Sequence, residues 1–306
     1  MESLVKMEKL YIIGGSGFIG KNLIDYFVGK YDITVFDKFI DINYFEAIPS
    51  VKTVQMDLVE NEISNVFPTP SYIINLASIV TAERDMKLFD GLISSNLKIL
   101  LNLYQRFKDQ KNLKLMIQFG SSEEYGNTIS PFSETQREEP NSPYALVKQL
   151  TVNSAMMLHR NYAFPIMAVR PGNLFGKYQN KSKFLPYVVS QLQANKDLDV
   201  TPCEQKRDFI YASDFAYCIG ELLNQTEKCL GQIVNVSSGE SISLKSIIEH
   251  LKTITSSKSK VNYGAIPYRE NEMMDLRCSV DKLEAIINKP IKFDFYKNLT
   301  NYIKTI

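Results

Sequence analysis

A glycine-rich turn near the start of the chain constrains its fold more than any other feature. The apolar run Leu10–Ile13 leads directly into the segment GGSGFIG at positions 14–20. Glycine lets the backbone turn tightly and approach a ligand closely, and the first amide groups of a following helix attract a diphosphate. The pattern therefore predicts a strand, a turn and a helix that bind a dinucleotide. The residues expected at that site are Gly14, Gly17, Phe18, Ile19 and Gly20.

Beyond this turn, short apolar runs alternate with longer amphipathic stretches. Runs of this length, rich in β-branched residues, favour buried strands over helices. The expected strands are Leu10–Ile13, Ile33–Phe36, Thr53–Gln55, Tyr72–Leu76, Leu115–Phe119 and Ile166–Arg170, and the expected helices are Phe18–Phe27, about Leu88–Lys108 and about Tyr144–Arg160. Because such alternation requires right-handed crossovers, the sequence predicts an α/β fold with a Rossmann-type, doubly wound parallel sheet.

The pattern changes in the second half of the chain. Phe184–Gln193 looks helical, and Phe209–Ile210 and Ile233–Val236 look like strands that return to the main sheet or lie beside it. The final segment alternates helices with short strands. We predict a dinucleotide-binding domain over residues 1–170, with returning segments at about 205–236. Residues 171–204 and 237–306 are expected to form a smaller, interleaved substrate lobe.

An acidic residue follows the second expected strand. A carboxylate at Asp37 can accept hydrogen bonds from both ribose hydroxyls and repels a 2′-phosphate, so it selects NAD over NADP. Lys38 can offset that repulsion, which leaves dual use open. Asp57 and Leu58 follow the third strand, where an adenine-binding pair is expected. The residues expected beside the ribose and nicotinamide are Leu76, Ala77 and Ser78.

Tyr144 and Lys148 are one helical turn apart, just after a helix start marked by Ser142 and Pro143. A phenol has a pKa of about 10, and lowering it to about 7 requires about 4 kcal/mol. An ammonium group about 4 Å away supplies that energy at an effective dielectric constant of about 20. We therefore expect Lys148, together with a positive nicotinamide ring, to lower the pKa of Tyr144 and enable proton transfer. In isolation, this spacing more often reflects core packing.

A second polar segment follows the strand Leu115–Phe119, with the sequence GSSEEYG at positions 120–126. The carboxyl end of a strand is where such sheets bind ligands. Ser121 or Ser122 can hydrogen-bond the reacting hydroxyl and complete a relay with the tyrosine and lysine. A simple turn is the alternative interpretation.

Taken together, these motifs resemble the extended short-chain dehydrogenase/reductase superfamily, in its nucleotide-sugar epimerase/dehydratase branch. The matching positions are Gly-x-x-Gly-x-x-Gly, Asp37, Asp57-Leu58, Asn75-Leu76-Ala77, Ser121-Ser122-x-x-Tyr125-Gly126, Tyr144-x-x-x-Lys148 and Arg170-Pro171-x-Asn173. Within the branch, residues 207–211 (RDFIY), 264–266 (GAI) and 269–272 (RENE) are most similar to bacterial sugar-nucleotide 4-ketoreductases such as CDP-abequose synthase.

The resemblance implies a role for each matching position. Ser121 and Tyr144 would be catalytic, and Lys148 would hold the nicotinamide ribose. The substrate, a nucleotide-diphosphate sugar, would contact Ser122, Asn173, Lys183, Phe184, Arg207 and Arg269. The two arginines would neutralise the diphosphate, because a guanidinium group matches phosphate oxygens well. Surface ion pairs are the alternative for both arginines.

The resemblance leaves the reaction open. Glu123 occupies the position of a glutamate used by dehydratases and decarboxylases of the branch. In contrast, Ser121 and Ser122 replace the Thr and Asp common in thymidine-nucleotide dehydratases, and Glu124 replaces an apolar residue. The resemblance thus implies NAD-dependent oxidoreduction or epimerisation at carbon 4 of a sugar used for surface glycans, with 4,6-dehydration or decarboxylation through Glu123 as the alternative. A non-catalytic dinucleotide-binding module is a third alternative, against which the intact hydroxyl, phenol and amine argue.

Composition argues against other classes of protein. The net charge is +1, and no apolar run is long enough to span a bilayer, so we expect neither nucleic acid nor a membrane as a partner. The four scattered cysteines predict reduced thiols, no metal and a cytoplasmic location. Relatives in the branch pair the helices at about 88–108 and 144–160 across a two-fold axis. We therefore expect a homodimer built on a four-helix bundle.

Overall fold

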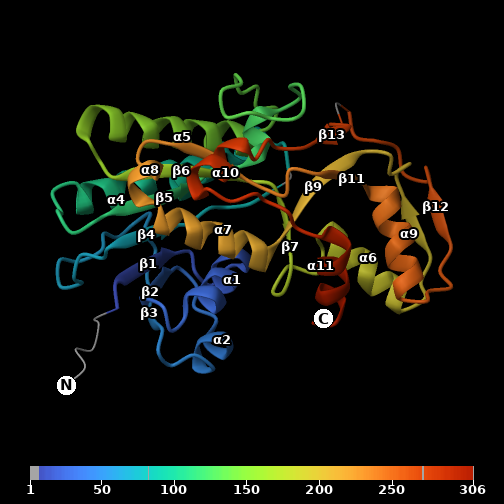
Figure 1. Cartoon of the computed structure of the whole chain (residues 1–306), viewed down its shortest axis with the longest axis horizontal. Helices are drawn as coiled ribbons and strands as arrows, with labels where there is room; N and C mark the ends of the chain where they lie inside the picture. Colours follow the sequence, from blue (N-terminus) through green and yellow to red (C-terminus); the bar gives the residue numbers. More distant parts are fainter. Residues whose placement is uncertain (1–6, 82, 271, 306) are drawn as a thin grey trace.

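A seven-stranded parallel sheet is the largest element of the computed structural model, which describes residues 7–81, 83–270 and 272–305. The strand order is β10-β6-β5-β4-β1-β2-β3, and Figure 1 shows these strands in the left half of the molecule. The strands are β1 Lys9–Ile13, β2 Asp32–Asp37, β3 Lys52–Gln55, β4 Tyr72–Asn75, β5 Leu115–Phe119, β6 Ile166–Pro171 and β10 Ile233–Val236. The order reverses between β1 and β4, the point where such sheets bind ligands. The predicted doubly wound α/β fold is confirmed.

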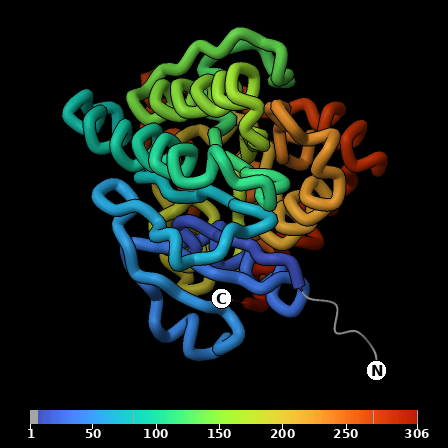
Figure 2. The backbone as a smooth tube through the Cα atoms, turned by 90° about the vertical axis from the view of Figure 1, so that its left-hand side faces the viewer, coloured from blue at the N-terminus to red at the C-terminus, as the bar shows by residue number. Residues whose placement is uncertain are grey.

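Helices cover both faces of this sheet because its strands are apolar on both sides. In β1, Leu10 and Ile12 face one core, whereas Tyr11 and Ile13 face the other. The first core is closed by α1 Phe18–Phe27, α7 Ala212–Asn224 and α10 Asp281–Ile287, and the second by α4 Ile99–Phe107 and α5 Pro143–Tyr162. Figure 2, turned by 90° from Figure 1, shows the main sheet between these helices.

The helix expected at about 88–108 consists of several consecutive pieces. A 3-10 turn (η1, Met86–Leu88) and α3 (Phe89–Ile93) precede a π-helical turn (η2, Ser94–Lys98), after which α4 begins. The buried Asn96 side chain donates a hydrogen bond to the Leu92 carbonyl oxygen at 2.9 Å within this stretch. Apolar periodicity alone does not reveal such a π turn, which widens the helix by one residue.

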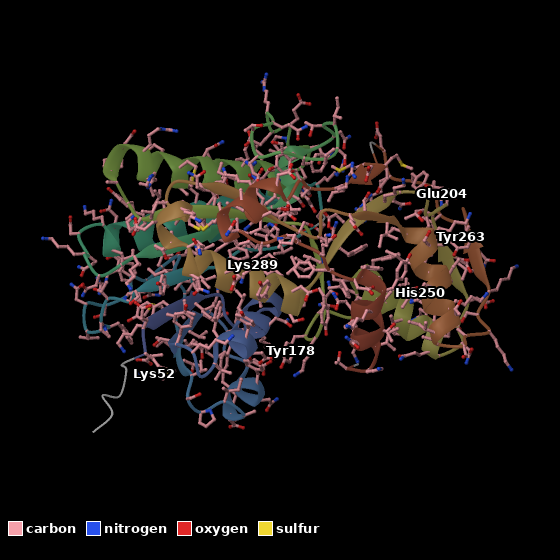
Figure 3. All side chains as sticks on the ribbon, viewed as in Figure 1. Lys52, Tyr178, Glu204, His250, Tyr263 and Lys289 are labelled. Atoms are coloured by element: carbon pink, nitrogen blue, oxygen red, sulfur yellow. The ribbon has the colours of Figure 1, made fainter. Side chains whose placement is uncertain are left out.

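One strand is less buried than the sequence predicts. Lys52, Thr53 and Gln55 of β3 are exposed, and Val54 is half-buried. Figure 3 shows Lys52 at the periphery of the molecule. The prediction of a buried strand here is wrong, because β3 lies at the edge of the sheet and pairs only with β2.

Later segments form a smaller layered unit with its own core, on the right of Figure 1. Its strands are β7 Asn173–Phe175, β8 Leu198–Val200, β9 Lys206–Tyr211, β11 Ser241–Ser243, β12 Val261–Tyr263 and β13 Asp275–Leu276, and its helices are α6 Phe184–Gln193, α9 Leu244–Ile254 and α11 Phe295–Ile303. The short elements elsewhere are α2 Ile42–Glu46, η3 Ser122–Tyr125 and α8 Thr226–Cys229. Thus β10 joins the main sheet, whereas β9 belongs to the smaller one. The division into domains stays a prediction.

Helix α9 provides a matched test of this smaller core. Ile247 is fully buried, whereas Ile254, on the same helix, is 37% exposed. We expect Ile247→Ala to lower the free energy of unfolding by about 2–5 kcal/mol, because it leaves a cavity. Ile254→Ala should cost less than about 1 kcal/mol. Denaturant titration of both variants measures the difference, and equal losses would contradict the placement of α9.

Candidate active site

Two continuous cavities lie at the carboxyl ends of the main-sheet strands. The larger, of about 930 Å³, follows β1, β2 and β4 and is lined by Gly14, Gly17, Phe18, Ile19, Gly20, Asp37, Lys38, Asp57, Leu58, Leu76, Ala77 and Ser78. The other, of about 630 Å³, is lined by Ser121, Ser122, Glu123, Tyr144, Lys148, Asn173, Lys183, Phe184, Arg207 and Arg269. Phe18, Leu76 and Lys183 line both cavities. The structure therefore brings all the site residues expected from the sequence to one continuous space.

The glycine turn makes room for a dinucleotide. Gly14 has φ +77°, and a Cβ there would lie 2.9 Å from the Ala77 nitrogen. A Cβ on Gly20 would lie 2.5 Å from the Gly15 oxygen, so this glycine lets α1 pack close to the turn. A Cβ on Gly17 would meet only Gly14 O, at 3.5 Å, and would otherwise point into space that a ligand can use. These features fit NAD, whose diphosphate would lie at the N-terminus of α1.

Asp37 is fixed at the end of β2. Its carboxylate accepts hydrogen bonds from the backbone amides of Ser16 at 2.9 Å and Phe39 at 3.1 Å. Lys38 forms an ion pair with Asp57 at 2.8 Å, which lowers the pKa of Asp57. Because Lys38 is engaged by Asp57, its charge offsets that of Asp37 less than the sequence suggests.

Ser121 and Tyr144 lie at two helix starts that face each other across the second cavity. Ser121 is the N-cap of η3, and its hydroxyl accepts a hydrogen bond from the Glu123 amide at 3.2 Å. Ser142 caps α5 by accepting a hydrogen bond from the Ala145 amide at 3.1 Å, as the sequence predicts. Tyr144 follows in the first turn of α5 and is 7% exposed.

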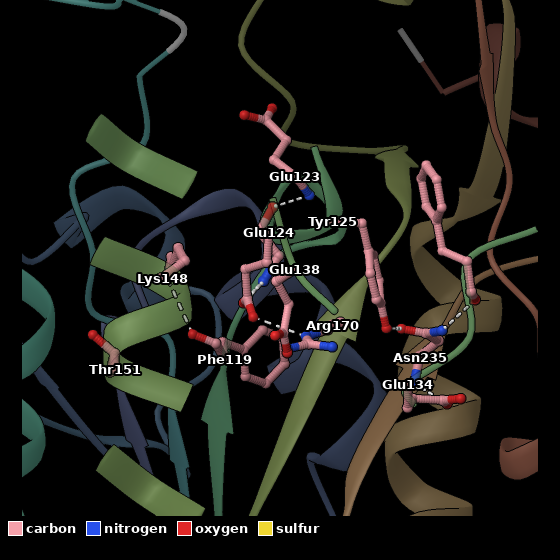
Figure 4. A network of polar contacts seen from close by, with 12 residues as sticks. Phe119, Glu123, Glu124, Tyr125, Glu134, Glu138, Lys148, Thr151, Arg170 and Asn235 are labelled. Carbon is pink, nitrogen blue, oxygen red and sulfur yellow. Dashed lines mark hydrogen bonds and ion pairs between the residues drawn. The ribbon is translucent and has the colours of Figure 1, made fainter. Parts of the chain in front are cut away.

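Burial has the largest effect on the acidity of Tyr144 in the protein itself. Burial raises the pKa of its phenol far above the usual range, Glu123 raises it further, and a hydrogen bond with Ser121 opposes the shift. The Lys148 ammonium lies 5.8 Å from the centre of the Tyr144 ring and donates to the Phe119 carbonyl at 3.1 Å (Figure 4). Among the protein's own groups, Lys148 is therefore not one that lowers the pKa of Tyr144. The lowering expected from the sequence also involves a positive nicotinamide ring, so it stays a prediction.

Glu123 points into the space shared by several positive groups. Burial raises the pKa of its carboxyl group, and the charges of Lys183, Arg84, Arg207 and Arg269 oppose that shift. The sequence analysis missed Arg84, which lines a smaller adjoining cavity of about 230 Å³ together with Glu123 and Arg207. A single arginine in a loop carries no local signal of such a role. The cluster makes this part of the site attractive to a diphosphate.

The remaining substrate candidates come from the smaller unit and the strand before it. Arg207 forms an ion pair with Glu272 and donates to the Met273 carbonyl at 2.7 Å. Asn173 donates to the Asp208 carbonyl at 3.3 Å. These contacts fix both side chains at the wall of the cavity. Asn271, part of the resemblance at 269–272, lies outside the described residues.

The model of the NAD-dependent epimerase/dehydratase family matches residues 10–237, which is most of the chain. The chain belongs to this family. CDP-abequose synthase from Salmonella muenchen is 36% identical over 118 residues, 39% of this chain and 40% of that protein. CDP-abequose synthase from Salmonella typhimurium is 26% identical over 308 residues, with 98% of each chain covered. The structure of UDP-glucuronic acid 4-epimerase from Bacillus cereus, in complex with UDP-glucuronic acid and NAD, has a TM-score of 0.89 at 20% identity, covering 97% of this chain and 98% of that one.

Membership of this family confirms the predicted enzyme class and its cofactor, NAD. The alternative of a non-catalytic module is therefore not supported. In residues 7–81, 83–270 and 272–305, no group of three or more His, Cys, Asp or Glu side chains is arranged to hold a metal ion. The four cysteines are buried free thiols. No helix in the described part of the chain is long and apolar enough to cross a membrane.

Cofactor preference tests the assignment of Asp37. We expect Asp37→Ala to weaken NADH binding about tenfold to a hundredfold, since it removes charge-assisted hydrogen bonds. The ratio of the affinity for NADH to the affinity for NADPH should therefore decrease. Titration of cofactor fluorescence measures both affinities. Asp32→Ala, at the opposite end of β2, is the matched control and should bind both cofactors like the parent protein. Unchanged affinities in the Asp37 variant would contradict the assignment.

Proposed function

We propose that this enzyme transfers a hydride between NAD(H) and carbon 4 of a nucleotide-activated sugar, as a 4-ketoreductase, 4-dehydrogenase or 4-epimerase. One observation carries the proposal. The hydroxyl of Ser121, the phenol of Tyr144 and the amine of Lys148 line one cavity, which continues into the glycine-lined cavity on one side and into the cationic cluster on the other. This arrangement suits a ligand with a reactive carbinol at one end and a diphosphate at the other.

The neutral phenol of Tyr144 is the form that the reductive direction uses. A buried neutral phenol is a poor base but a ready proton donor, because an alkoxide forming beside it is far more basic than the phenolate. Tyr144 would donate its proton to the oxygen on carbon 4, and Ser121 would hold that oxygen through its hydroxyl. When bound, NADH supplies the hydride for this reduction. We therefore favour reduction of a 4-keto sugar, the activity that the name of a relative, dTDP-4-dehydro-6-deoxyglucose reductase from Escherichia coli, also suggests.

The other groups of the site would bind and orient the substrate. Arg207 and Arg269 would neutralise the diphosphate, and Asn173 would hydrogen-bond to it. Lys183, at the start of α6, lines both large cavities and would lie between cofactor and substrate. Phe184 would pack against the nucleotide base. A role in the biosynthesis of surface-glycan sugars is part of this proposal.

Glu123 supports a second candidate function, 4,6-dehydration or decarboxylation. Its carboxyl group lines the reaction cavity, and burial raises its pKa toward the range in which a carboxylic acid can donate a proton. An elimination needs such an acid near carbon 6 of the sugar. The mass of the product, compared with that of the substrate, separates this candidate from simple reduction.

Incubation with a panel of activated sugars tests the reaction. Nucleotide hexoses are offered with NAD, and nucleotide 4-keto-6-deoxyhexoses with NADH. We expect oxidation of NADH and a product that has gained two hydrogens, measured by absorbance and mass spectrometry. Tyr144→Phe should lose at least about a hundredfold in turnover while it still binds NADH.

Two outcomes would contradict this proposal. A product that has lost water or carbon dioxide would favour the Glu123 chemistry. Unchanged turnover in Tyr144→Phe would exclude the phenol as proton donor. Retained NADH binding in the variant separates a catalytic defect from a folding defect.

The proposal also includes a homodimer in the cytoplasm. Leu101 on α4 and Leu146 and Leu150 on α5 are each about two-fifths exposed, at 39%, 41% and 40%. The two helices are neighbours, with the rings of Tyr104 and Tyr162 5.7 Å apart. A second copy of the same pair of helices would bury these leucines in a four-helix bundle.

Light scattering tests this assembly. We expect the parent protein to be a dimer and Leu146→Lys/Leu150→Lys to be a monomer, because two ammonium groups would be buried in the interface. Ile254→Lys, at a similarly exposed position on α9, is the control and should remain dimeric. A monomeric parent protein would contradict the proposed dimer.

A further inference from the structure

Glu124 is a fully buried acid next to the reaction cavity. Its Oε1 accepts a hydrogen bond from the Ser121 amide at 2.8 Å, and its Oε2 accepts one from Arg170 Nε, also at 2.8 Å. Gly120 makes room for this carboxylate, since a Cβ there would lie 2.3 Å from Glu124 Oε1. Both Glu124 and Arg170 have 0% exposed side chains. The carboxylate is thus held in one place by contacts on two sides.

Arg170 pairs with a second carboxylate besides Glu124. Its guanidinium also forms an ion pair with Glu138 and lies 4.7 Å from the centre of the Tyr125 ring (Figure 4). Two carboxylates therefore share one guanidinium. Burial raises the pKa of the Glu124 carboxyl group, and the charge of Arg170 and the hydrogen bond from the Ser121 amide oppose that shift and favour the carboxylate. Burial lowers the pKa of the nearby Lys282, and the charge of Glu134 opposes that shift.

Lys148 lies directly beside this cluster. Its amine donates to the carbonyl of Phe119, the residue before Gly120. The Cβ that Gly120 lacks would also lie 2.7 Å from Val152 Cγ2, one turn beyond Lys148 on α5. Figure 4 shows Lys148 and Glu124 on either side of this strand end. Tyr144 and Glu123 line the cavity that Lys148 faces.

We infer that Glu124 is a positioning residue, whose buried carboxylate keeps the Lys148 amine in its charged form. Lys148 is only 3% exposed, and an ammonium group so deeply buried loses its proton unless a negative charge compensates for its lost hydration. Burial lowers the pKa of Lys148 to about 8, and the charge of Glu124 opposes that shift. The use of this charge to hold the cofactor ribose rests on the proposed function, whereas the charge itself does not.

The charge of Lys148 can be measured without any substrate. Acetic anhydride reacts only with neutral amines, so the pH at which the labelling rate of Lys148 reaches half its maximum, measured by mass spectrometry of its peptide, reports its pKa. We expect a midpoint near pH 8 in the parent protein. In Glu124→Gln, which keeps the shape of the side chain, it should fall by about one pH unit or more, an approximately tenfold smaller ratio of charged to neutral amine.

Glu134→Gln is the matched control, because it removes a nearby carboxylate that faces Lys282 rather than Lys148. Its midpoint should equal that of the parent protein. An unchanged midpoint in folded Glu124→Gln would overturn the inference, as would a parent midpoint below about pH 7. The midpoint of the parent protein is measured without any variant, so this test applies even if Glu124→Gln does not fold. A shifted midpoint in a protein without sugar turnover would support this inference and contradict only the proposed function.

Discussion

All seven strands of the main sheet point the same way, and the position of each functional group follows from this constraint. The carboxyl ends of β1, β2, β4 and β5 meet at one edge, on both sides of the point where the strand order reverses. Gly14, Asp37 and Ser121 are far apart in the sequence, yet each follows or ends one of these strands. Helix α5 begins at the same edge and adds Tyr144 and Lys148. An antiparallel strand among these would have carried its functional residue to the opposite edge.

Burial, more than close pairing of charges, sets the acid–base properties of this site. Tyr144 stays protonated because it is removed from water and faces the charge of Glu123. The same removal from water lowers the pKa of Lys148, and the amine stays charged because an acid lies behind it. The positive nicotinamide ring of an oxidised cofactor would lower the pKa of Tyr144, whereas the neutral ring of a reduced cofactor would not. The two directions of hydride transfer therefore require different states of one phenol.

Sequence reasoning succeeded where a structure depends on neighbours along the chain. The glycine turn, the cap at Ser142 and the acid at the end of β2 each follow from a few consecutive residues. It failed where distant segments decide the outcome. Glu124 and Arg170 are 46 positions apart, so the sequence around either residue does not predict the ion pair. The exposure of β3 depends on the absence of a strand beyond it, which the composition of β3 does not encode.

The acid at position 124 is possible only because two other positions accommodate it. A side chain at 120 would occupy the place of the carboxylate, and without Arg170 that carboxylate would lose its ion-pair partner while it stays buried. An unpaired buried charge costs several kcal/mol, about half of the stability of an ordinary domain. Glu124 therefore depends on both Gly120 and Arg170, and the three residues form one packed unit. This unit also borders Ser121 and Lys148. A substitution at any of the three positions, even one that the core accommodates, will therefore alter the surroundings of the groups that take part in proton transfer.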